Sequence, residues 1–254
     1  MSNTNRRRWA SIVLFSAFTA GAVMSQPAQP KIRRVTFYTV KADRVGDFLA
    51  ATKEYAEAAK KAGSDRYLSI WSSISGNREF AQVRYYQNFA EFDQRLDPKT
   101  KDIAGQLTSI SARIMATVES SRTVISTIDA ETSLPIQSGQ PQAYARVLQT
   151  WVRPGQIDNY RALIKAEMLP AAKKAGMKLY SRSRVRMGGS TNEFNSVTGF
   201  DKWAELDGEG PIVKAIGGQA AYEKFLAKLN PMITRTEVQV YRFMKDQSYL
   251  PPGS

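Results

Sequence analysis

The pattern of apolar and polar positions divides the chain into a short series of elements. Runs rich in β-branched and aromatic residues predict strands, and apolar residues spaced three and four apart predict amphipathic helices. In the first half the expected elements are a strand at 33–40, a helix at 44–62, a hairpin at 66–74 and 79–86, a helix at 103–118 and a strand at 122–128. The order is therefore β-α-β-β-α-β.

The second half repeats this series. Its expected elements are a strand at 146–152, a helix at 157–175, a hairpin at 178–187 and 193–200, a second helix and a final strand at 237–244. Pro170 predicts a kink or break in the first of these helices, because proline removes a backbone donor. Residues 78–94 match residues 192–208 in one frame, with Glu79 opposite Glu193, so we infer an internal duplication.

This order is that of the ferredoxin-like fold. Its helices cover one face of a four-stranded antiparallel sheet, and two copies can cover the other face by packing sheet against sheet. The predicted fold class is therefore α+β, with two fused ferredoxin-like β-α-β-β-α-β repeats whose antiparallel sheets form a barrel-like pseudo-dimer. The expected divisions are repeat 1 at 26–130, a linker at 131–143 and repeat 2 at 144–254.

Two stretches carry a resemblance to known families. They are the helix ending in EMLPAAKKAG (167–176) and an EF-x-x-V-x-x-aromatic strand that leads into a short FAE or WAE helix. In these the chain resembles the antibiotic-biosynthesis-monooxygenase-like and NIPSNAP-like families. The resemblance implies a dimeric α+β barrel, here fused into one chain. The activities it implies are cofactor-free oxidation of aromatic substrates, haem degradation and ligand binding.

The first 25 residues have the pattern of a secretory signal peptide. Arg6, Arg7 and Arg8 form a basic region, and the uncharged run WASIVLFSAFTAGAVM follows. Cleavage is expected after Ala22 or Ser25. The alternative is an uncleaved anchor, but the apolar run is shorter than the roughly 20 residues that span a bilayer. We therefore expect a periplasmic or secreted protein with no integral membrane segment after cleavage.

The composition excludes several chemistries. The chain has no cysteine and no histidine, which removes disulfides, thiolate metal sites, His-ligated haem and Ser-His-Asp triads. We therefore expect no metal site and no cofactor. The formal net charge of +13 suits a polyanionic partner or simply a solvated basic surface. Export makes nucleic acid an unsuitable partner, and the sequence leaves the oligomeric state open.

The interior between the two sheets is the natural pocket for a small ligand. Phe80, Gln82, Arg84 and Tyr86 share one strand face, which we expect to line the interior because the opposite face carries the small Val83. The candidate contacts for a planar, partly apolar ligand are Tyr38, Arg84, Tyr86, Trp151 and Glu193. The alternative is that aromatic side chains fill the barrel solidly.

Charged residues give two further candidates. A carboxylate such as Glu193 or its counterpart Glu79 could act as a base if burial raised its pKa, although solvation or ion pairing is commoner at a strand end. Arg182, Arg184 and Arg186 alternate along one strand face. They could bind a carboxylate or phosphate, or they could guard a sheet edge against pairing.

Two functions follow from these candidates. The first is an exported barrel protein that binds a small aromatic or amphipathic molecule between its sheets, with cofactor-independent oxygenation as its enzymatic form. The alternative is a non-catalytic envelope protein whose basic surface, including the three arginines, binds polyanions or a protein. A division of labour, with ligand binding in the second repeat alone, is compatible with either.

Overall fold

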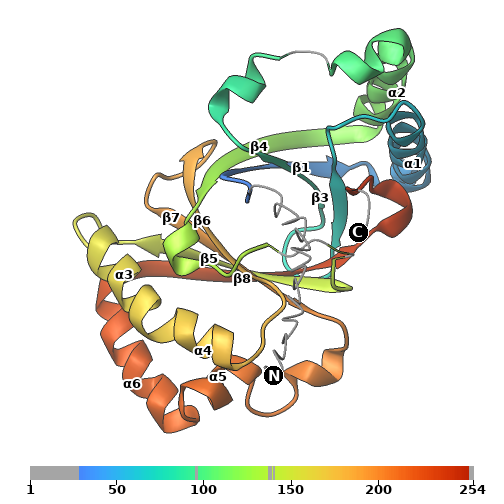
Figure 1. Cartoon of the computed structure of the whole chain (residues 1–254). Helices are drawn as coiled ribbons and strands as arrows, with labels where there is room; N and C mark the ends of the chain where they lie inside the picture. Colours follow the sequence, from blue (N-terminus) through green and yellow to red (C-terminus); the bar gives the residue numbers. More distant parts are fainter. Residues whose placement is uncertain (1–28, 95–96, 137–138, 140, 252–254) are drawn as a thin grey trace, which may run out of the picture.

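A computed structural model of the chain describes residues 29–94, 97–136, 139 and 141–251. The predicted signal peptide lies outside these residues. The strands are β1 (Ile32–Val40), β2 (Ser69–Ser73), β3 (Phe80–Tyr86), β4 (Val118–Ile128), β5 (Tyr144–Val152), β6 (Tyr180–Met187), β7 (Glu193–Phe200) and β8 (Ile233–Phe243). They form a closed antiparallel barrel in the order β1-β3-β2-β8-β5-β7-β6-β4 (Figure 1). Each half contributes one four-stranded sheet, and the predicted fold class is confirmed.

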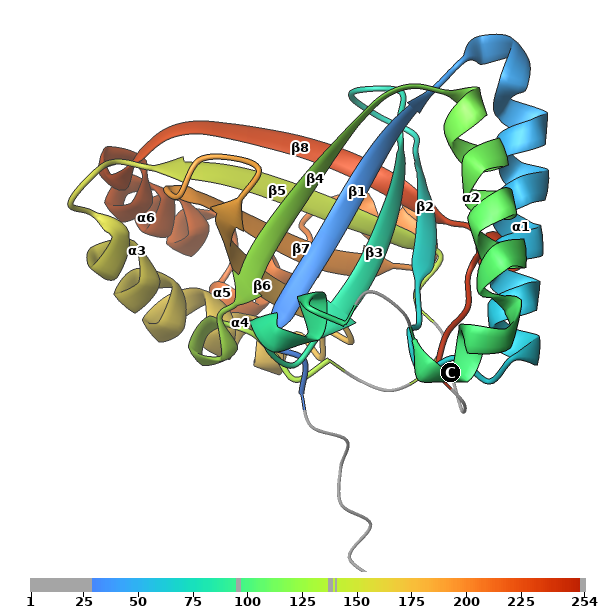
Figure 2. The same cartoon turned by 90° about the horizontal axis from the view of Figure 1, so that it is seen from above.

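The helices lie outside the barrel. They are α1 (Val45–Lys61), α2 (Ala104–Thr117), α3 (Ile157–Leu163), α4 (Leu169–Lys174), α5 (Pro211–Ile216) and α6 (Gln219–Leu229), with a π-helical turn at Ile164–Met168. The pair α1 and α2 lies on one side of the barrel and α3 to α6 lie on the other (Figures 1 and 2). Among the described residues, no helix combines the length and apolar character needed to cross a membrane.

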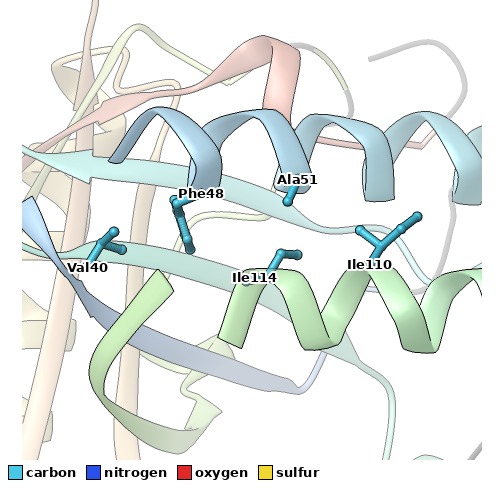
Figure 3. Close-up of a cluster of buried hydrophobic side chains, with 5 residues drawn as sticks. All are labelled: Val40, Phe48, Ala51, Ile110 and Ile114. Atoms are coloured by element: carbon cyan, nitrogen blue, oxygen red, sulfur yellow. The ribbon is translucent and has the colours of Figure 1, made fainter. Parts of the chain in front are cut away.

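The first helical layer packs on the outer face of its sheet. Phe48 and Ala51 of α1 meet Ile110 and Ile114 of α2, and Val40 closes the cluster from β1 (Figure 3). A matching cluster in the second half joins α3, the π-helical turn and α6 to the outer face of β5 and β7. Its buried residues are Val152, Tyr160, Ile164, Phe194 and Phe225.

The expected orientation of β3 is wrong. Phe80 faces outward, with its ring centroid 4.8 Å from that of Phe48 on α1. Val83 packs inside the barrel with the buried side chains of Trp71, Ala145 and Tyr241. The physical reason is that Trp71 and Tyr241 project into the interior opposite β3, so the small residues Ala81 and Val83 of β3 face them. The large aromatic residue fills the wider space beneath the helices.

Barrel closure also settles the environment of the arginine strand. β6 pairs with β7 on one side and with β4 on the other, and β2 pairs with β8 to close the ring. β6 is therefore not a sheet edge, so its arginines have no edge to guard. Because neighbouring strands alternate in direction, β1 and β5 run the same way, and the starts of β3, β4, β7 and β8 share one rim.

The break expected at Pro170 is confirmed. The α-helical pattern changes to the π-helical turn Ile164–Met168, and Pro170 then lies in the first turn of α4, where no backbone donor is needed. The later break between α5 and α6 was not predicted. It falls at Gly217 and Gly218, whose φ angles are +117° and +86°, a conformation that glycine adopts without strain.

Candidate functional site

Two adjoining pockets open on the outer face of the first sheet, not between the sheets. Their volumes are about 200 and 240 Å³. The larger pocket lies between β3, helices α1 and α2, and the 3-10 turn Pro98–Ile103, and the smaller one continues it past the end of β3 to Glu91 and Gln94. Both are lined by Arg66, Arg84 and Asp97. We call this combined space the α1–β3 groove. The groove forms because the outer face of β3 is apolar at its start, where Phe80 packs on α1, and polar near its end, where Arg84 lies.

Arg84 is the central group of the groove. It projects from the outer face of β3, with its guanidinium carbon 6.0 Å from the centroid of the Tyr55 ring on α1. Its Nε is buried and has no hydrogen-bond partner among the described residues. An unsatisfied buried donor is uncommon in native structures and asks for an explanation. The Arg84 side chain lines both pockets, and a guanidinium in such a place is suited to an acidic group.

Asp97 forms a fixed wall of the groove. Its Oδ2 accepts hydrogen bonds from Ser64 Oγ at 2.6 Å and from the Asp65 amide at 3.2 Å, and its Oδ1 accepts one from the Lys99 amide at 3.0 Å. Burial alone would raise the pKa of Asp97, but these hydrogen bonds outweigh it and hold the pKa below its usual value. Asp97 is thus an ionised anchor whose oxygens are already engaged.

The structure places the candidates Tyr38, Arg84 and Tyr86 together on the outer face of the first sheet. Tyr86 lines the groove and stacks on Phe92, with ring centroids 4.4 Å apart. Tyr38 lies beneath α1, and its hydroxyl is 3.5 Å from Gln82 Oε1. Burial raises the pKa of Tyr38, and the nearby Arg84 partly offsets this rise. These three residues therefore lie on the outer face of the sheet and not in the interior, and of them Arg84 and Tyr86 line the groove.

The three arginines of β6 share a face, as expected, but they do not form one anion site. Arg182 is 4% exposed and lies against Tyr160 and Tyr180, whose hydroxyls accept its hydrogen bonds. Arg184 Nε donates to the Thr191 carbonyl at 2.7 Å. Arg186 is exposed. Along β6, Arg182 is buried, Arg184 is half-buried and Arg186 is exposed to solvent. One ligand would therefore not contact all three arginines.

Trp151 and Glu193 do face the barrel interior, at the rim where β7 begins. They are direct cross-strand neighbours. Glu193 is 7% exposed and accepts a hydrogen bond from Asn195 at 3.3 Å. Burial raises the pKa of Glu193, while Asn195 and the charge of Arg122 pull it down. The Glu193 carboxyl group therefore has a raised pKa and lies near the Arg122 guanidinium. This is the kind of environment in which a glutamate was expected to act as a base.

The duplicated Glu79 occupies the same rim with different partners. Its Oε1 accepts a hydrogen bond from the Tyr241 hydroxyl at 2.7 Å, and its Oε2 lies 3.4 Å from Arg122 Nη2. Arg122 in turn stacks 3.7 Å above the centroid of Phe37. Sequence reasoning missed Tyr241 and Arg122. The signal that could have identified Arg122 was its charge at an inward-facing position of β4. That position can be recognised only when it is known which residues of the strand face the interior.

The described residues contain no group of three or more His, Cys, Asp or Glu side chains that could hold a metal ion. The chemistry available to the groove is therefore that of guanidinium, phenol and carboxylate groups. These can bind and orient an acidic aromatic molecule and stabilise its anion.

Comparison with known proteins places the fold. No protein-family model matches the chain, and no curated protein gives a significant match. Among solved structures, a candidate monooxygenase of Lactobacillus acidophilus NCFM superposes with a TM-score of 0.62 at 11% identity, over 87% of this chain and 97% of that one. A candidate monooxygenase of Fusobacterium nucleatum gives 0.60 at 16% identity, over 90% and 98%.

An anthrone oxidase-like protein superposes with a TM-score of 0.55 at 11% identity, over 85% of this chain and 92% of that one. At these identities the likeness is one of fold. The chain thus shares the eight-stranded α+β barrel of these proteins over most of its length.

Proposed function

We propose that this protein binds a small amphipathic aromatic molecule with an acidic group in the α1–β3 groove. The observation that carries the proposal is Arg84, whose Nε is buried without a partner while the side chain lines both pockets. A carboxylate or phenolate of the ligand would accept from this guanidinium in a charge-assisted hydrogen bond. The expected ligand class is that of the sequence prediction, but the site lies under the helices instead of between the sheets.

The walls of the groove support an aromatic body for the ligand. Tyr67 and Tyr86 line one pocket, and Tyr55 and Leu107 line the other. Each pocket alone is smaller than the roughly 300 Å³ of a typical small-molecule site. The two adjoin at Arg84, so one planar molecule could extend through both.

Cofactor-free oxidation is the enzymatic form of this proposal. It is supported by neighbours in fold that are named as candidate monooxygenases and as anthrone oxidase-like. In such a reaction O₂ converts an activated CH₂ group to a carbonyl, and its second oxygen atom leaves as water. Arg84 would stabilise the enolate or phenolate form of the substrate, which is the form that donates an electron to O₂. The chain has no histidine, so proton removal would fall to a carboxylate or to the solvent, which favours a substrate with an acidic CH₂ group.

The test combines binding with oxygen uptake. The chain from residue 26 onward is titrated calorimetrically with anthracene-2-carboxylate and with its neutral amide, and oxygen uptake is recorded with anthrone. Arg84→Gln should weaken carboxylate binding about tenfold or more, in line with loss of a charge-assisted bond. Arg78→Gln removes an exposed arginine and is the matched control. Equal affinity for acid and amide, or for both variants, would overturn the proposal.

Polyanion binding by the basic surface is the alternative proposal. The burial of Arg182 and the backbone contact of Arg184 weaken its original support, but the net charge of +13 remains. Heparin binding that falls steeply between low and moderate salt would favour it. Weak, salt-insensitive retention would exclude it.

We also propose that residues 1–25 direct export to the periplasm or medium and that the chain arose by fusion of two copies of one repeat. The domain division at 26–130, 131–143 and 144–254, and the resemblance to NIPSNAP-like proteins, belong to this proposal. Its support is the basic and apolar N-terminal pattern and the matching segments 78–94 and 192–208. The mass of the protein recovered from the periplasm should correspond to cleavage after Ala22 or Ser25; an uncut chain retained with membranes would contradict export by cleavage.

A further inference from the structure

The inner face of the barrel holds an arginine that no acid accompanies. Arg33 projects inward from β1 and is 5% exposed. Its Nη2 donates to Ser183 Oγ on β6 at 2.5 Å, reaching across β4. Its Nε is buried, and within residues 29–251 as far as the structure describes them it has no hydrogen-bond partner. The ion pairs within the described part of the chain include none at Arg33.

A buried guanidinium without an anion is unfavourable, because burial removes its hydration and the neutral Ser183 and Tyr85 hydroxyls replace it only in part. The effect is visible in the pKa of Arg33, which burial lowers and the neighbouring Tyr85 only partly restores. Two explanations are open. Either the folded protein is destabilised by the desolvation of Arg33, or an anion binds next to Arg33 in the functional state. A second observation favours the anion.

Ser181 provides that observation. It lies two residues before Ser183 on the same inner face of β6 and is 1% exposed, and no described residue makes a hydrogen bond with its Oγ. Ser126 completes the polar surface from β4, where its Oγ lies 3.4 Å from the Arg33 carbonyl oxygen. Arginine and serine donors thus face one space, while the described residues supply no acceptor for two of them. A carboxylate offers the missing acceptor oxygens.

The opposite part of the interior is apolar. Trp71 of β2 and Ala145 of β5 are buried there, and Phe243 stacks near Trp71 with ring centroids 5.1 Å apart. Val83 and Val197 belong to the same cluster but stay half-buried. Inward-facing side chains that keep accessible surface indicate that the interior is not packed solid. An eight-stranded barrel is wide enough for one small ligand.

We propose that the barrel interior is a second binding site, separate from the α1–β3 groove, for a small carboxylate with an apolar or aromatic body. The carboxylate is held by Arg33 and Ser181, and the body lies against Trp71 and Phe243. Solvent reaches the other rim, where Arg122 stacks on the inward-facing Phe37 and yet remains 46% exposed. That rim is the route of entry.

The proposal is tested by calorimetric titration with benzoate, and with benzamide as the neutral analogue. Arg33→Met removes the charge at nearly constant length, and it should weaken benzoate binding about tenfold or more while sparing benzamide. Arg34→Met is the matched control, because Arg34 is the next residue of β1 and faces outward. Circular dichroism verifies that each variant is folded. Ser181→Ala, a smaller change, should weaken benzoate binding severalfold and serves if Arg33→Met does not fold.

The two binding proposals are separated by Arg84→Gln, which should leave interior binding of benzoate unchanged. A crystal grown with 4-bromobenzoate locates the ligand by its bromine signal. Bromine inside the barrel, with carboxylate oxygens on Arg33, confirms the site. Failure of the wild-type protein to bind benzoate, equal affinity in Arg33→Met, or bromine only in the groove would each overturn it. The first two results leave groove binding of the larger ligand untouched, and the third would support it.

Discussion

Glu79 and Glu193 occupy equivalent starts of β3 and β7, and their different neighbours show how a repeated sequence acquires different chemistry. Glu79 accepts a hydrogen bond from the Tyr241 hydroxyl and pairs with Arg122. Glu193 accepts one from Asn195 and feels Arg122 only at longer range. One guanidinium therefore serves two buried carboxyl groups unequally.

The Tyr241 hydroxyl should contribute measurably to stability. Tyr241→Phe removes the donor that Glu79 uses and leaves the buried carboxyl group with two long contacts to Arg122 Nη2, at 3.4 and 3.5 Å. Loss of a buried hydrogen bond to a charged group costs about 1–3 kcal/mol. Chemical denaturation at neutral pH measures the loss. Tyr222→Phe is the control, because no hydrogen bond of the Tyr222 hydroxyl occurs within the described residues; equal losses in both variants would argue against the Glu79 contact.

Glu193 should make stability fall as pH rises. Its folded pKa is raised above the ordinary value of 4.5, chiefly by burial. The folded state therefore binds the proton more tightly than the unfolded state, and this stabilisation is present at low pH and lost as pH rises through the folded pKa. The slope for one such group is at most about 1.4 kcal/mol per pH unit.

Glu193→Gln isolates this contribution. The unfolding free energies of the wild type and the variant are compared from pH 4 to pH 8. The variant should gain relative to the wild type as pH increases, and the difference should level off above the folded pKa. A difference that is constant across this range, or that changes with the opposite sign, would contradict a raised pKa. Other carboxyl groups, such as Asp97, affect both proteins alike and cancel.

At the scale of elements, the sequence predicted existence and order well, because periodicity is a local property. The break at Pro170 is local too, since it follows from one missing donor. Strand orientation is not local. Whether Phe80 or Val83 faces inward depends on how many strands share the interior, and that number is a property of the closed ring. Because the inward-facing positions of β3 were predicted wrongly, Arg84 was expected inside the barrel. Arg33, which does face the interior, was not recognised as a candidate.

The hairpin between β6 and β7 shows a constraint of this non-local kind. Gly188 has a φ of +79°, and a Cβ there would lie 1.9 Å from the carbonyl oxygen of Thr123 on β4. The turn therefore needs glycine both for its backbone conformation and for its contact with β4. The Gly-Gly pair indicated a turn, but the contact with β4 could not be read from it.

Comparison with Gly155 separates these two requirements. Gly155 has the same φ of +79°, but a Cβ there would meet nothing within 4 Å. Gly155→Ala should cost only the left-handed conformation, about 1–2 kcal/mol, while Gly188→Ala should cost about 3 kcal/mol or more because β4 must also shift. Denaturant unfolding of both variants gives the two values. If the losses were equal, the hairpin would have to be free to move away from β4.

At the scale of the whole molecule, the two repeats complete each other. Sheet pairing between β2 and β8 and between β4 and β6 closes the barrel across the halves. The inner cluster is shared as well, with Trp71 and Ala81 from the first half and Ala145 and Tyr241 from the second. Opening either half would expose two strand edges and this apolar surface of the other. The packing of one sheet against the other was predicted, but the edge pairs β2–β8 and β4–β6 were not, because each repeat is a complete ferredoxin-like unit by its own pattern.

The shared closure predicts one unfolding transition for the entire barrel, although a chain of this size often unfolds in steps. Tryptophan fluorescence can follow the unfolding of each half separately. Trp71 reports on the first half, and Trp151 and Trp203 report on the second. Guanidinium unfolding of the chain from residue 26 is followed by fluorescence in Trp71→Phe and in the Trp151→Phe, Trp203→Phe double variant, with far-UV circular dichroism as the common probe. Because neither half can keep its edge strands paired alone, fluorescence and circular dichroism midpoints should coincide within each variant. A fluorescence midpoint displaced from the circular dichroism midpoint would show that one repeat stays folded after the other opens, and the barrel would then be two stable domains in contact.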